Sequence, residues 1–256
     1  MQSVLQKATH DDVNAEPFPH ALVRNALAAD YYDQLSAAFP TLEQVARGQR
    51  IENNRAYLLS GQRCLESDEL APIWRNFMQY HLSHDFFREA CQLLGDKFRQ
   101  MHPEIDRLIG RPLERATVGM RRPGATEDIL LDCQFGINSP VAEESRVRGI
   151  HVDNHRKLFN ALLYMRVPDD NSRGGELALY RDEKPLQWGF GGDLYGVQDE
   201  AVTECGRVAY SANLLVMFVN SPRSFHGVTP RSVTPHVRRY INFLAEVRQP
   251  LFPLPA

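Results

Sequence analysis

The chain has 256 residues, of which 43% are hydrophobic and 24% are charged, and its formal net charge is −3. That length can bury a large core, and the composition is typical of an ordinary folded domain. The small net charge excludes a general attraction to nucleic acid or acidic membranes, and no apolar run is long enough to cross a bilayer. The first residues lack the apolar segment of a secretory signal, so we expect a cytoplasmic protein.

The four cysteines agree with that expectation. Cys64, Cys91, Cys133 and Cys205 are far apart in the chain and form no CxxC pair. Such spacing favours reduced thiols packed as small hydrophobic side chains over a zinc site or a disulfide framework.

The first part of the chain is predicted to be mostly helical. Residues 16–23 contain two prolines and look extended, and residues 28–47 look helical with an interruption near Pro40. A longer helix is predicted over residues 72–100, because apolar side chains recur there at spacings of three and four. This stripe consists of Ile73, Phe77, Tyr80, His84, Phe87, Cys91, Leu94 and Phe98. His81 and His84 lie one turn apart, but we favour side chains packed on the helix over a metal site.

From residue 113 onward the spacing of the apolar residues changes from that of a helix to that of strands. Short apolar or alternating segments are separated by Gly, Pro, Asn and Asp, with no helix-length segment between them. Eight or nine such strands predict an antiparallel sandwich or barrel, with the long helix covering one sheet. We therefore expect one mainly β domain, with helical support over residues 1–112 and the β-sandwich over residues 113–256.

The candidate metal ligands start from His151-Val152-Asp153. Side chains alternate along an extended segment, so His151 and Asp153 point to the same face. The triplet alone is weak, because similar triplets begin at His10 and His102. His226, which follows an apolar strand and a polar turn, is the candidate third ligand. Two histidines and one carboxylate with open positions are the ligand set of non-haem Fe(II) oxygenases.

A basic residue near the end of the chain is the candidate anchor for a carboxylate. Arg238 and Arg239 open the last apolar strand and point to opposite faces, so at most one enters the site. A guanidinium pairs with a carboxylate through two parallel hydrogen bonds, which suits the anchoring of a dicarboxylate.

Taken together, four motifs resemble those of 2-oxoglutarate- and Fe(II)-dependent oxygenases of the prolyl-hydroxylase-like type. They are HVD at 151–153, GGEL at 174–177, SFHGVTP around His226 and RRYINF at 238–243. The N-terminal segments EPFPHALVRNAL and YYDQLSAAFP also resemble the strand and helix that often precede the catalytic sandwich in that group.

The resemblance implies a double-stranded β-helix, or jelly roll, with His151, Asp153 and His226 as iron ligands. It implies Fe(II), 2-oxoglutarate and O₂ as cofactor and cosubstrates, with ascorbate in support, and hydroxylation of a substrate with release of succinate and CO₂. The family's carboxylate anchor normally lies where this chain has Pro235 and His236. A loop insertion would shift it to Arg239, which we favour, or to Arg238.

Polar residues on the neighbouring strands are further candidates for contacts with cosubstrate or substrate. The resemblance points to Gln134, Asn138 and Asn160, although ordinary polar strand positions explain them equally well. Basic residues flank the predicted site and would suit an anionic substrate or a phosphorylated sugar, although we favour solvated charges at the rim. They are Arg121, Arg122, Arg146, Arg148, Arg156 and Lys157. Residues 180–207 are a plausible specificity loop, with Trp188 and Tyr195 as possible contacts.

Three other readings stay open. A zinc peptidase would use His151 and His155, but the Glu after the first His of HExxH is missing and the setting is strand-rich. A cupin-like metal enzyme without 2-oxoglutarate and a non-catalytic jelly-roll binding protein share the predicted fold. A small metabolite, a peptidyl side chain or a saccharide could each be the substrate, and no oligomeric state is indicated.

Overall fold

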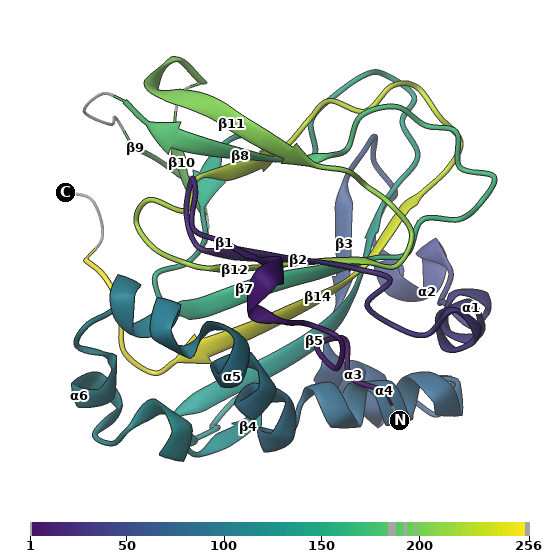
Figure 1. Ribbon diagram of the computed structural model, residues 1–256. Helices are drawn as coiled ribbons and strands as arrows, with labels where there is room; N and C mark the ends of the chain where they lie inside the picture. Colours follow the sequence, from purple (N-terminus) through teal and green to yellow (C-terminus); the bar gives the residue numbers. More distant parts are fainter. Residues whose placement is uncertain (1, 184–187, 192–193, 198, 254–256) are drawn as a thin grey trace.

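Strands dominate the protein, and a layer of helices covers one of its two sheets (Figure 1). The computed structural model describes residues 2–183, 188–191, 194–197 and 199–253. Among the described helices, none combines the length and the apolar character that a membrane crossing requires.

The helices lie in the first half of the chain, as the sequence predicts. They are α1 (Ala29–Ala37), α2 (Leu42–Ala46), α3 (Gly61–Glu66), α4 (Pro72–His81), α5 (His84–Met101) and α6 (Ile105–Ile109). Short 3₁₀ turns form at His10–Asp12, Leu113–Arg115 and Asp199–Ala201. The interruption expected near Pro40 separates α1 from α2. Thr41 then caps α2, because its hydroxyl accepts from the Gln44 amide while the Gln44 side chain accepts from the Thr41 amide.

The helix predicted over 72–100 is broken into α4 and α5. The break falls at Leu82 and Ser83, where the Ser83 hydroxyl accepts a hydrogen bond of 3.4 Å from the Phe86 amide and starts a new helix. Phe77 and Phe87 are buried on either side, but His84 in the first turn of α5 is exposed. The apolar stripe therefore predicted the packed face of α5 after its first turn, but it matched α4 only in part and missed the capping serine.

His81 is a satisfied core residue, as the sequence analysis favoured. Its Nδ1 donates to the Phe77 carbonyl at 2.7 Å, and its Nε2 accepts from the Val4 amide at 3.1 Å. Burial lowers the pKa of His81 to about 3, so the ring is neutral and uses both nitrogens within the core.

The larger sheet lies against the helices (Figure 1). Its strands, in spatial order, are β1 (Val13–Asn14), β2 (His20–Arg24), β12 (Leu214–Val219), β7 (Lys157–Tyr164), β14 (Arg238–Val247), β5 (Ile129–Asn138) and β3 (Ala56–Leu59). β4 (Val118–Met120) also pairs with β5, in parallel, whereas the other described pairings are antiparallel.

The smaller sheet faces the larger one across the pocket described below. Its strands, in spatial order, are β11 (Val202–Val208), β8 (Leu177–Asp182), β13 (His226–Val228), β6 (His151–Val152), β10 (Leu194–Val197) and β9 (Trp188–Gly191). From β5 to β8 each strand lies in the opposite sheet to the one before it, and from β11 to β14 the same alternation recurs. Segments far apart in sequence are thereby brought to one pocket.

The core sits on both faces of the larger sheet. One apolar cluster joins the helices to this sheet and includes Ile241, Phe243 and Ala245 of β14. The alternate positions of the same strand, including Arg238 and Tyr240, face the smaller sheet. Because side chains alternate along a strand, this packing determines which of the two consecutive arginines faces the pocket.

Candidate metal centre

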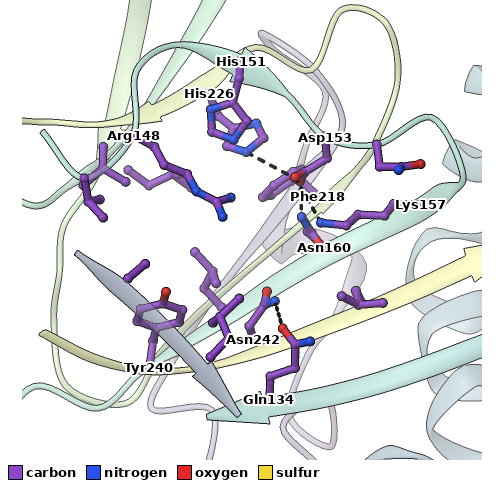
Figure 2. Close-up of a pocket in the computed structure, with 18 of the residues that line it drawn as sticks. Gln134, Arg148, His151, Asp153, Lys157, Asn160, Phe218, His226, Tyr240 and Asn242 are labelled. Atoms are coloured by element: carbon purple, nitrogen blue, oxygen red, sulfur yellow. Dashed lines mark hydrogen bonds and ion pairs between the residues drawn. The ribbon is translucent and has the colours of Figure 1, made fainter. Parts of the chain in front are cut away.

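A pocket of about 350 Å³ lies between the two sheets, and Figure 2 shows its interior. Residues of β5, β7, β12 and β14 line it from the larger sheet, and residues of β6, β8 and β13 line it from the smaller one. Its walls carry histidines, carboxylates, amides and guanidinium groups, a concentration of polar groups that ordinary core packing does not need.

The three predicted metal ligands meet at one end of this pocket. His151 begins β6, Asp153 directly follows that strand, and His226 begins β13, where it pairs across the sheet with His151. One possible ligand atom from each residue lies within 4.8 Å of the others, and all three side chains are buried. The structure thus brings together residues that are 75 positions apart in the sequence (151 and 226).

Both imidazoles present Nε2 to the shared space. His151 Nδ1 bonds to the Gly149 carbonyl at 2.8 Å, and His226 Nδ1 bonds to the Ser224 carbonyl at 2.9 Å. A carbonyl only accepts, so each Nδ1 carries the proton and each Nε2 keeps its lone pair. Burial lowers the pKa of both rings, that of His151 to about 3, which holds them in the neutral form that metals bind.

Asp153 supplies the negative charge of the cluster. Lys157 Nζ lies 3.1 Å from Asp153 Oδ1, and the Asn160 side-chain amide donates to Oδ2. Burial alone would raise the pKa of Asp153, but the charge of Lys157 lowers it below its usual value. His226 Nε2 is 3.7 Å from Asp153 Oδ2. Two neutral nitrogens and one carboxylate oxygen suit a divalent first-row metal ion.

Arg238 is the buried cation of the same pocket. Its side chain is buried, and its Nε donates to the Gly175 carbonyl at 3.0 Å. Its guanidinium carbon lies 4.9, 5.0 and 5.2 Å from the ring centroids of Tyr164, Tyr210 and Tyr240. Arg238 Nη2 and the Tyr164 hydroxyl are buried without a hydrogen-bond partner among the described residues. Such unsatisfied groups are costly, so their pairing here points to a ligand.

Arg239, which the sequence analysis favoured as the anchor, faces the other way. Its guanidinium donates to the Met165 carbonyl at 3.1 Å and to the Ser36 carbonyl and hydroxyl at 3.3 and 2.8 Å. It also lies over the Phe39 ring, 4.9 Å from its centroid, on the helical side of the sheet. Arg239 is therefore occupied away from the pocket, and of the two neighbouring arginines it is Arg238, the second choice, that lines the pocket.

The GGEL motif shapes the wall behind Arg238. Gly174 and Gly175 have φ values of 80° and 79°, a conformation that side chains disfavour. A β-carbon on Gly174 would overlap the Pro230 carbonyl, and one on Gly175 would lie 3.0 Å from Arg231 Cγ. The two glycines let the backbone approach these groups closely enough for the Gly175 carbonyl to accept from Arg238.

The predicted polar residues all line the pocket but differ in their contacts. Asn160 holds Asp153, whereas Gln134 donates to Asp132 at 2.7 Å and accepts from Asn242 at 2.8 Å. Asn138 is buried, and neither its amide nitrogen nor its oxygen has a partner among the described residues. Both polar atoms of the Asn138 amide are therefore free to contact a bound molecule, and so is Asn160 Oδ1, which also has no partner among the described residues.

The predicted rim charges divide into two groups. Arg121, Arg148 and Lys157 line the pocket. The others are engaged elsewhere, Arg122 with Glu127, Arg146 with Asp199 and Arg156 with the Val247 carbonyl. The predicted specificity loop at 180–207 contains residues 184–187, 192–193 and 198, which lie outside the described residues, as do the side chains of Trp188 and Tyr195.

Sequence reasoning missed Tyr164 and Asn242. Both occupy alternate positions on strands whose other face packs against the helices. A period of two along RRYINF could have indicated Asn242, because it shares a face with Arg238. Nothing in the sequence singles out Tyr164 among nine tyrosines.

Comparison with known proteins gives likeness to solved structures alone. No protein-family description and no curated protein matches the chain. A prolyl-4-hydroxylase from Pseudomonas putida matches with 15% identity and a TM-score of 0.44, over 90% of this chain and 93% of that one. A Trichoplax adhaerens prolyl hydroxylase, solved with a hypoxia-inducible-factor peptide, matches with 15% identity and a TM-score of 0.45, over 89% and 83%. The auxin-oxidation dioxygenase of Arabidopsis thaliana, solved with 2-oxoglutarate, matches with 11% identity and a TM-score of 0.48, over 90% and 84%. The chain is thus similar, at low identity, to solved oxygenases of the type that its motifs resemble, and its function has to be argued from the site itself.

Proposed function

We propose that this chain is a 2-oxoglutarate- and Fe(II)-dependent dioxygenase that hydroxylates its substrate and releases succinate and CO₂. The observation that carries the proposal is the meeting of two neutral imidazoles and a carboxylate in a pocket that also contains a buried guanidinium whose Nη2 has no hydrogen-bond partner among the described residues. The strand alternation between the two sheets is, on this proposal, that of a double-stranded β-helix.

His151, Asp153 and His226 would hold the iron. Their tautomers and ionisation states already suit a metal, because backbone carbonyls fix both Nδ1–H groups and Lys157 and Asn160 keep Asp153 anionic and oriented. Bound iron and 2-oxoglutarate would supply the oxidising chemistry, while the protein supplies ligands, orientation and exclusion of water.

Arg238 and Tyr164 would hold the distal carboxylate of 2-oxoglutarate. Among the described residues no acidic side chain forms an ion pair with Arg238, although its side chain is almost fully buried. Burying a cation without a counter-ion costs several kcal/mol. A carboxylate would accept from both Arg238 Nη2 and the Tyr164 hydroxyl, and would thereby satisfy both unpartnered groups.

The proposal is tested by turnover of labelled 2-oxoglutarate. Purified protein supplied with Fe(II), ascorbate and air should release labelled succinate, and replacement of Fe(II) by Zn(II) should stop the release. His226→Ala should abolish it, whereas His10→Ala, which alters an exposed histidine in another His-x-acid triplet, should not. Metal-dependent activity without 2-oxoglutarate consumption would favour the cupin-like reading. The complete absence of 2-oxoglutarate binding and turnover would refute the proposal.

A further inference from the structure

One arginine of the pocket has no role in the site as described so far. Arg148 precedes His151 by three residues, and Figure 2 shows its guanidinium pointing into the pocket, between the two histidines and Tyr240. It is close enough to act electrostatically on Tyr240 and on all three candidate metal ligands. Its guanidinium forms no ion pair or hydrogen bond with any described residue. The charge of Arg148 is thus directed at the space where a substrate would lie.

The other cations of the pocket have partners. Lys157 pairs with Asp153 at 3.1 Å, and Arg121 pairs with Glu246 at 3.0 Å. Arg238 is assigned above to the distal carboxylate of 2-oxoglutarate. Among the described pocket residues, Arg148 is therefore the cation left without a counter-ion once the proposed cosubstrate is bound.

We propose that Arg148 binds an anionic oxygen group, a carboxylate or a phosphate, on the primary substrate. This inference rests on the proposed function, because it assumes that Arg238 is taken by 2-oxoglutarate. A guanidinium donates two parallel hydrogen bonds to either group and keeps its charge at any physiological pH. Since Arg148 lies beside the candidate metal ligands, the carbon that is oxidised lies near the anionic group.

The opposite wall fits a small polar acid. Gln134 and Asn242 are neutral amides that bond to each other at 2.8 Å across β5 and β14, facing the pocket. Neutral amides can donate to a substrate oxygen without repelling an anion, as a carboxylate wall would. Apart from Arg238, which is assigned to the cosubstrate, the pocket thus combines the cation Arg148 with two neutral amides on the facing wall, where Glu246 is already paired with Arg121.

Arg146 offers a matched control from the same segment. It lies two residues before Arg148, is exposed, and pairs with Asp199 at 2.7 Å outside the pocket. A substitution there removes the same charge from the same stretch of chain. It leaves the pocket wall intact.

The test measures binding without turnover. Wild-type protein, Arg148→Gln, Arg148→Lys and Arg146→Gln are loaded with Zn(II) and saturated with 2-oxoglutarate. Binding of butyrate and ethyl phosphate is then compared by ligand-observed NMR with that of the neutral molecules butyramide and ethanol. The two anions distinguish a carboxylate substrate from a phosphorylated one.

We expect at least one anion to bind the wild-type and Arg146→Gln proteins, and both neutral molecules to fail. Its affinity should fall roughly 10- to 100-fold in Arg148→Gln, the worth of one hydrogen bond between charged groups, and less in Arg148→Lys. Failure of both anions to bind, equal binding by the neutral molecules, or unchanged anion binding in Arg148→Gln would overturn the inference. The inference would also be overturned if Arg148→Gln chiefly weakened the binding of 2-oxoglutarate, because Arg148 would then bind the cosubstrate. Failure of the proposed function would be seen separately, because the wild-type protein would then not bind 2-oxoglutarate.

Discussion

Substitutions of the two neighbouring arginines of β14 should have opposite effects. One should lower the affinity for 2-oxoglutarate without loss of stability, and the other should lower stability without loss of affinity. Arg238→Gln removes a buried guanidinium from the pocket, and with it one or two charge-assisted hydrogen bonds to the proposed carboxylate. Each such bond is worth about 1.5–3 kcal/mol, so the affinity for 2-oxoglutarate should fall roughly 10- to 100-fold if one bond is lost and roughly 100- to 10,000-fold if two are lost. Without cosubstrate the same variant should be as stable as wild type or more stable, because an uncompensated buried charge has been removed.

Arg239→Gln should behave in the reverse way. Its guanidinium bonds to Met165 and Ser36 on the helical side, so the variant loses three structural hydrogen bonds. We expect a loss of roughly 1–3 kcal/mol in the free energy of unfolding, and no change in 2-oxoglutarate affinity. Anaerobic titration of the Fe(II) protein with 2-oxoglutarate, followed by absorption, measures the affinity, and urea unfolding measures stability. If Arg239→Gln weakens 2-oxoglutarate binding and Arg238→Gln does not, the assignment of Arg238 is refuted.

Three further substitutions test the site and the fold. Asn160→Ala removes the hydrogen bond to one oxygen of Asp153, so we expect metal affinity to fall roughly 10- to 100-fold. Competition with a chelator measures this affinity, and an unchanged value would show that Asn160 does not position Asp153. Gly136→Val places a side chain where the Tyr240 ring lies, so urea unfolding should show a loss of about 1–3 kcal/mol or more. Ser83→Ala removes the cap of α5 and should cost about 1 kcal/mol in the same measurement, whereas an unchanged midpoint would mean that the cap is dispensable.

Much of the architecture could be predicted because it follows from local patterns. The change from a helical to a strand period near residue 113 predicted the division between the helices and most of the strands. The segment predicted to be extended at 16–23 overlaps β2, but β1 and β3 are exceptions, since neither residues 13–14 nor residues 56–59 were predicted as strands. They gain strand conformation by pairing with the edges of a sheet formed later in the chain.

The candidate site was predictable where a motif fixes both spacing and chemistry. Strand alternation places His151 and Asp153 on one face, but the resemblance of four motifs was needed to single out this triplet and His226. The choice between Arg238 and Arg239 needed the face of β14 that packs against the helices, which only the tertiary structure provides. Ile241, Phe243 and Ala245 face the helices. Because side chains alternate along the strand, Arg239 lies on that same face. Arg148 was found among six basic residues, but its unpaired state depends on contacts from distant segments.

At both edges of the larger sheet, strands from the N-terminal part of the chain pair with strands from the C-terminal part, and this limits how far the chain can be shortened. β2 covers β12 on one side and β3 covers β5 on the other, so the N-terminal segment supplies a flanking strand at each rim. Deleting the first 60 residues would expose both rims at once, and open strand edges recruit other chains. A shortened protein that begins at Gly61 should therefore aggregate, even though every candidate metal ligand lies beyond the deletion.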